Sequence, residues 1–246
     1  MKKQAFPKEL VPLALQTNEK LQNYLYKQGR INLLIHSLYL KHGKYIKRFL
    51  NYDVIAEAFN QEFFLKNYTK ALLLFYTLYE MGCSLDSELF DVGSGATPGG
   101  IAFSQVRQHL GFEAPMIKIL DKSKIQLNLA KKYCEQNDVQ IDKILKKRFQ
   151  IDNADYDSML FFSYFICEQG RSFIKELYRH REYFKHGFAV VDYQQTVERI
   201  ERTFQKNGCY RIISVYRCFA LPEPLQTIFH EKEVFVNGCF YEPRKN

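Results

Sequence analysis

Features that would assign the chain to a membrane or secreted class are missing from its 246 residues. The longest apolar runs, such as ALLLFYTLY at 71–79, are far shorter than the roughly 20 residues that span a bilayer. Two lysines precede Pro7 without an apolar segment beside them, which is a poor match to a signal peptide. We therefore expect a cytoplasmic protein that has no membrane partner.

Closely spaced metal ligands are missing too. Six cysteines and six histidines are scattered along the chain, with no C-x-x-C pair and no H-x-x-x-H spacing. A zinc site needs closely spaced ligands, and a disulfide framework is typical of small secreted chains. We expect reduced thiols and no metal site.

The net charge of +8 is distributed unevenly. Residues 1–84 contain 12 Lys and Arg against 6 Asp and Glu, whereas the rest of the chain contains 23 against 21. Such an excess favours a polyanionic partner, although a lysine-rich proteome would also produce it.

The pattern of apolar residues divides the chain into two parts. From Leu10 to about Gly82, apolar residues recur at intervals of three and four, which predicts helices. After residue 85, short strand-like runs alternate with helical segments, and no Ser- or Pro-rich linker separates the parts. We expect a helical module at 1–84 and an α/β domain at 85–246. The expected strands are 88–93, 116–121, 141–147, 157–164, 187–193, 210–220 and 227–238, and the expected helices are 98–110, 124–136, 171–184 and 195–207.

This alternation predicts a mostly parallel sheet that is covered by helices on both faces. Only LPEPLQ (221–226) separates the last two expected strands, so these two are expected to pair antiparallel. The sequence thus predicts seven strands that end in a hairpin.

The stretch LFDVGSGATPGG, residues 89–100, joins the first expected strand to its helix. Such a loop lies at the carboxyl edge of a parallel sheet, where open α/β folds bind their ligands. Gly93 and Gly95 allow positive φ and a close approach of backbone to a ligand. Thr97 is expected to cap the helix, and Pro98 suits its first turn.

Two acids accompany this loop. Asp91 lies in an apolar strand, where a buried carboxylate is costly unless a cation compensates it. Asp121 ends the next strand, MIKILD, in the position of an acceptor for the two hydroxyls of a ribose. The alternative is that both acids are ordinary loop caps in a fold that binds no ligand.

This combination resembles the class I S-adenosylmethionine-dependent methyltransferases, whose sheet is Rossmann-like and ends in an antiparallel hairpin. The G-x-G-x-x-x-G spacing and the hairpin argue against a nicotinamide-binding domain. The resemblance implies S-adenosyl-L-methionine as cofactor, with Gly93 and Gly95 near its methionine part, Asp91 near its ammonium group and Asp121 on its ribose. It further implies contacts from Ser94, Thr97, Gly99, Lys122 and Ser163, and an adenine site near Asp152 and Asn153. The loop is also similar to that of small-subunit rRNA guanine-N7 methyltransferases, but only the superfamily is assigned.

The acceptor-binding residues of this superfamily usually follow the fourth strand, here FFSYFICEQGR at 161–171. The Asn/Asp-Pro-Pro-aromatic motif of amino-group methylation is missing there, and Cys167 lacks the proline that usually precedes a cysteine nucleophile. Tyr164 and Glu168 are the remaining candidate catalytic residues, unless Tyr164 fills the core and Glu168 only begins a helix.

Cations alternate with aromatics in LKHGKYIKR at 40–48, as in surfaces that bind phosphates and bases, so we expect RNA contacts from Lys41, Lys44, Tyr45, Lys47 and Arg48. The sequence favours a methyltransferase that acts on RNA, plausibly ribosomal. A small aromatic or metabolic acceptor, and a binding or assembly factor without catalysis, stay open.

Overall fold

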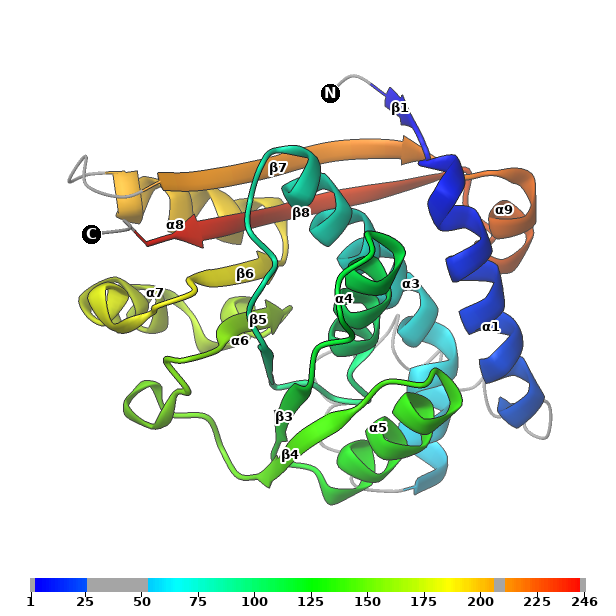
Figure 1. Cartoon of the computed structure of the whole chain (residues 1–246), viewed down its shortest axis with the longest axis horizontal. Coiled ribbons are helices and arrows are strands. Elements are labelled where there is room, and N and C mark those ends of the chain that lie inside the picture. Colours follow the sequence, from blue (N-terminus) through cyan, green and yellow to red (C-terminus); the bar gives the residue numbers. More distant parts are fainter. Residues whose placement is uncertain (1–2, 26–52, 206–210, 244–246) are drawn as a thin grey trace.

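The computed structural model describes residues 3–25, 53–205 and 211–243. Its centre is one eight-stranded sheet with the strand order β1-β7-β8-β6-β5-β2-β3-β4 (Figure 1). The strands are β1 (Lys3–Ala5), β2 (Leu89–Val92), β3 (Ile117–Asp121), β4 (Ile141–Lys146), β5 (Met159–Ser163), β6 (Phe188–Val191), β7 (Arg211–Ala220) and β8 (Glu233–Glu242).

Strands β2 to β6 are parallel to one another, and β8 pairs antiparallel with both β6 and β7. The expected Rossmann-like α/β class, with its antiparallel hairpin, is therefore confirmed. The main helices are α1 (Val11–Leu25), α3 (Asp53–Glu80), α4 (Pro98–His109), α5 (Lys124–Gln136), α6 (Ile166–Gln169), α7 (Arg171–Arg179), α8 (Gln194–Gln205) and α9 (Glu223–Phe229).

Two details of the predicted sheet are wrong. An eighth strand, β1, pairs in parallel with the edge strand β7, and it lies in the part of the chain where only helices were expected. The connection between the last two strands contains the helix α9. This helix begins directly after Pro222, and its last residues occupy the start of the expected strand 227–238. The last strand accordingly starts at Glu233 rather than near residue 227.

Helices cover both faces of the sheet, and successive residues of a strand face opposite layers. Leu89 of β2 packs in a cluster with α1, α3, α4, α5 and α9, whereas its neighbour Phe90 packs with α7 and α8. Alternation of this kind is expected for strands that are buried on both faces. Asp91 therefore points toward the layer that contains α3 and α4.

Helix α3 belongs to the core of the sheet domain. Leu72, Leu74 and Phe75 are fully buried in the same cluster as the strands. A Cβ on Gly238 of β8 would lie 2.7 Å from the Leu74 side chain, so a bare Cα allows this close approach. The helix ends in a turn at Gly82, which has φ +80°, as the sequence predicted. The division of the chain at residue 84 stays a prediction, and the two parts share one core.

Candidate active site

The glycine loop at the end of β2 is shaped for a close backbone approach. Gly93 and Gly95 have φ values of +64° and +54°, which glycine adopts without strain. A Cβ on Gly93 would lie 2.5 Å from the ring of Phe165, and a Cβ on Gly99 would lie 2.0 Å from the ring of Phe161. Neither position has room for a side chain. At Gly93 the ring of Phe165 packs directly on the loop, and at Gly99 the helix α4 packs directly on Phe161 of the sheet.

Asp91 is only 1% exposed, and its carboxylate has one satisfied oxygen. Oδ2 accepts hydrogen bonds from Thr97 Oγ1 at 2.7 Å and from the Gly100 amide at 3.2 Å. Oδ1 has no hydrogen-bond partner among the described residues. Burial raises the pKa of Asp91 to about 7, against the opposing effect of the two donors. A buried, half-satisfied carboxylate of this kind fits a ligand that brings a cation or a donor.

Thr97 has a different role from the expected helix cap. It occupies the N-cap position of α4, but its side chain makes no capping bond, and its hydroxyl donates to Asp91 instead. It is fully buried, adopts φ +55° and does not line the cavity described below. Thr97 thus holds the Asp91 carboxylate from behind.

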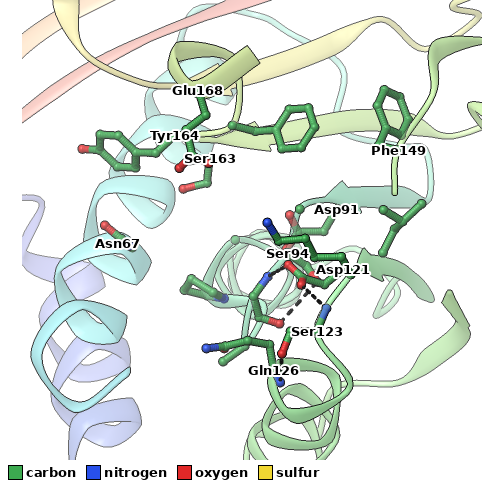
Figure 2. Close-up of a pocket in the computed structure, with 18 of the residues that line it drawn as sticks. Asn67, Asp91, Ser94, Asp121, Ser123, Gln126, Phe149, Ser163, Tyr164 and Glu168 are labelled. Atoms are coloured by element: carbon green, nitrogen blue, oxygen red, sulfur yellow. Dashed lines mark hydrogen bonds between the residues drawn. The ribbon is translucent and has the colours of Figure 1, made fainter. Parts of the chain in front are cut away.

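Asp121 closes the glycine loop from the neighbouring strand. Its Oδ2 accepts from the Gly95 amide at 3.0 Å, and its Oδ1 accepts from the Ser123 amide at 2.8 Å (Figure 2). Burial raises the pKa of Asp121, and these amide donors oppose the shift. Each carboxylate oxygen keeps a lone pair that can accept from a ligand hydroxyl.

A cavity of about 480 Å³ lies beside the loop, within the range of roughly 300–1,000 Å³ that is typical of small-molecule sites. Ten of the predicted site residues line it, which are Asp91, Gly93, Ser94, Gly95, Gly99, Asp121, Lys122, Ser163, Tyr164 and Glu168. The structure therefore brings together residues from the ends of β2, β3 and β5 around one space.

Other predicted site residues lie elsewhere. The Asp152 side chain is 81% exposed and pairs with His180 at 3.1 Å, so it points away from the cavity. Asn153 follows it at the end of the 3-10 helix Ile151–Asn153. The expected RNA-contacting residues Lys41, Lys44, Tyr45, Lys47 and Arg48 lie outside the described residues.

The segment after β5 is held in a strained turn beside the cavity. Tyr164 has φ +52°, which is uncommon for an aromatic residue. Its amide donates to the Val191 carbonyl at 2.8 Å, and its hydroxyl accepts from Lys70 Nζ of α3 at 2.9 Å. Burial raises the pKa of Tyr164. In Figure 2 the Tyr164 ring points toward α3, whereas Ser163 faces the space above the glycine loop.

A further acid fixes the same turn from β6. Asp192 follows β6, is 2% exposed and accepts from the Cys167 amide at 3.0 Å. The Cys167 thiol contacts the Tyr164 carbonyl at 3.1 Å, so it is engaged inside the turn. These contacts hold Glu168, the next residue along, at the cavity wall.

Sequence reasoning missed one entire wall of the cavity. Asn60, Phe63, Phe64 and Asn67 of α3 line it, at the spacing of one helical face. Lys147, Arg148 and Phe149 after β4 line it as well. The helical spacing in α3 was a usable signal, but nothing in the sequence showed that this face turns toward the glycine loop.

The described residues contain no group of three or more His, Cys, Asp or Glu side chains that could hold a metal ion. Nor does this part of the chain contain a helix long and apolar enough to cross a membrane.

No family model and no curated protein matches the sequence. Among solved structures, the chain is similar to a precorrin-6y C5,15-methyltransferase from Geobacter metallireducens, with a TM-score of 0.48 and 12% identity over 68% of this chain and 86% of that one. It is also similar to the N-terminal domain of human METTL16 in complex with SAH, with a TM-score of 0.44 and 13% identity over 74% and 71%. A third is ribosomal protein L11 methylase from Lactobacillus delbrueckii subsp. bulgaricus, with a TM-score of 0.45 and 13% identity over 71% and 78%. By its own strand order and terminal hairpin, this chain is a Rossmann-like α/β protein with a cavity at the carboxyl edge of its sheet.

Proposed function

We propose that this chain is an S-adenosyl-L-methionine-dependent methyltransferase. The observation that carries the proposal is the pairing of two carboxylates around one glycine loop and one cavity. Asp91 offers a buried oxygen that has no partner in the described part of the chain, and Asp121 offers spare lone pairs at the next strand end. A nucleoside that carries a cationic amino acid chain would use both groups.

The residues present fit this cofactor. Gly93 and Gly95 line the cavity where the methionine part would lie, Asp91 would compensate its ammonium group, and Asp121 would accept from the ribose hydroxyls. When bound, the cofactor supplies an electrophilic methyl group on a sulfonium, which an acceptor lone pair takes in line as the carbon–sulfur bond breaks.

The protein's part in such a reaction is to align the acceptor and exclude water. Phe165 closes against Gly93, and Phe149 packs beside it in an aromatic cluster, so this side of the cavity is apolar. Ser163 and Tyr164 stand where an acceptor would enter, and Glu168 could take a proton from an acceptor that carries one. A ring nitrogen would need no such base.

We further propose that the acceptor is RNA. Lys122, Lys147 and Arg148 are exposed and line the cavity, and they follow the paired strands β3 and β4. Among the described residues, none of the three has a carboxylate within ion-pair distance of 4.0 Å. Exposed cations that form no ion pair beside a cavity favour a phosphate-bearing acceptor.

Calorimetry with S-adenosyl-L-methionine tests the cofactor proposal. Asp121→Ala is expected to weaken binding by about tenfold or more, because a hydrogen-bonded acceptor for the ribose is lost together with the clamp on Gly95. Asp152→Ala is the matched control and should leave affinity unchanged, since its side chain pairs with His180 and does not line the cavity. A wild-type protein that does not bind the cofactor would refute the proposal.

Mass spectrometry of nucleosides and metabolites from cells with and without the protein tests the acceptor. A methyl mark on RNA that disappears with the protein is the expected result. A methylated metabolite that disappears instead would replace RNA by a small acceptor.

A further inference from the structure

The cavity-facing side of α3 contacts the rest of the site at two levels, one beside the glycine loop and one beside the segment after β5. Asn60 Nδ2 donates to Gln126 Oε1 at 3.0 Å, and that oxygen lies 3.7 Å from the position of a Cβ on Gly95. Asn60 thus lies at the level of the glycine loop. Lys70, almost three turns further along, bonds to Tyr164 and lies at the level of the segment after β5.

Asn67 lies at the level of the segment after β5, because it precedes Lys70 by about one helical turn. It is half-buried and lines the cavity, and its side-chain amide has no hydrogen-bond partner in the described part of the chain. Asn60, by contrast, bonds to Ala56 and Gln126. Figure 2 shows Asn67 across the same space as Ser163. A half-buried amide that lines a cavity and forms no hydrogen bond to the described residues is available to a ligand that enters the cavity.

The surroundings of Asn67 define the ligand's chemistry. Phe63, one turn earlier on the same face, lines the cavity with an aromatic ring. An asparagine amide offers a donor and an acceptor side by side, which matches the edge of a nitrogen heterocycle. An aromatic face next to such an amide is the arrangement by which proteins bind unstacked bases.

We propose that Phe63 and Asn67 of α3, with Ser163 opposite, form an acceptor subsite for a single unstacked nucleobase. This inference rests on the proposed function and names the part of the acceptor that enters the cavity. Phe63 stacks on the ring, and Asn67 bonds to an edge with one donor and one acceptor. Lys70 is a positioning residue, because it holds Tyr164 and so fixes the turn that presents Ser163.

Saturation-transfer NMR with AMP, CMP, GMP and UMP, each in the presence of SAH, tests the subsite. The base protons of at least one nucleotide are expected to receive saturation from the wild-type protein. Asn67→Ala should weaken that binding by about tenfold, the effect of losing one two-point amide contact, and Phe63→Ala should weaken it as well. Asn237→Ala is the matched control, because this asparagine of β8 does not line the cavity.

SAH affinity, measured by calorimetry on each variant, separates the possible failures. Both cavity variants should bind SAH like the wild type, which would show that they fold. Asn67→Asp is a second, smaller change, which keeps the size of the side chain but removes its donor. If the wild type binds SAH but no base proton is saturated, or if Asn67→Ala and Asn67→Asp bind the base unchanged, the subsite is refuted while the methyltransferase proposal stands. If the wild type does not bind SAH, the proposed function fails instead.

Discussion

At the scale of single residues, Asp91 combines a stability cost with a proposed binding role. Its pKa in the folded protein is about 7, against 3.8 for the unfolded reference. The folded state therefore holds a proton that the unfolded state releases between these values. The free energy of unfolding therefore falls as the pH rises from about 4 to 7, and it has lost the full contribution of Asp91 above pH 7. The upper limit of this loss is about 1.4 kcal/mol for each unit by which the pKa is raised.

Asp91→Asn removes this titration while its amide oxygen can still accept from Thr97 and Gly100. We expect the variant to be more stable than the wild type at pH 8, with the difference shrinking toward pH 4, and to bind S-adenosyl-L-methionine at least about tenfold more weakly. Urea unfolding at several pH values and calorimetry measure the two effects. A variant that is less stable at pH 8, or one that binds the cofactor unchanged, would contradict this assignment.

The sequence predicts residues well where their role follows from backbone geometry. Gly93, Gly95 and Asp121 lie where a strand–loop–helix pattern requires them. Thr97 and Asp152 were less predictable, because several partners compete for a hydroxyl or a carboxylate in a loop. Only the fold decides that Thr97 donates to Asp91 and that Asp152 pairs with His180.

At the scale of elements, α3 shows why helical periodicity alone does not reveal that the first part of the chain packs in the core of the sheet. Its central segment ALLLF, 71–75, is apolar on all sides, and all five residues are buried. A helix that is apolar all round lies inside a core, whereas a separate module would show one apolar stripe. That composition was the available signal. The short strand β1 gives almost no signal, because three residues are too few for a period of two to appear.

Removal of residues 1–84 should therefore prevent folding of the rest of the chain. Without α3, the strand residues that pack against Leu72, Leu74 and Phe75 would be exposed on one face of the sheet. We expect residues 85–246 alone to be insoluble or to lack cooperative unfolding, and co-expression of residues 1–84 to restore a soluble complex. A dispersed NMR spectrum and a sharp unfolding transition for 85–246 alone would instead show an independent domain.

At the scale of the whole molecule, the strand pairing of the sheet brings basic residues together at the edge that holds the cavity. Because β3 and β4 pair in parallel, with Asp121 opposite Lys146, the residues that follow them lie next to each other. This register brings Lys122 close to Lys147 and Arg148 at the cavity, although 24 residues of chain lie between Lys122 and Lys147. The sequence predicts the RNA contacts at residues 40–48, where cations alternate with aromatics. The pairing of two distant loops was not visible.

RNA binding should therefore depend on salt through these cations. With a labelled single-stranded RNA of about 20 nucleotides, the slope of log K against log salt should fall by about 1 for each phosphate contact removed, so Lys147→Ala with Arg148→Ala should lower it by about 2. Lys175→Ala with Arg199→Ala removes the same net charge from exposed positions on α7 and α8 and should change the slope little. SAH affinity should be equal in both double variants, because none of the four side chains is assigned to the cofactor. An unchanged slope for Lys147→Ala with Arg148→Ala would exclude the loop after β4 from RNA binding. If polyglutamate competes with the labelled RNA as well as unlabelled RNA does, the partner is an acidic protein, because polyglutamate has the negative charge of RNA without its bases.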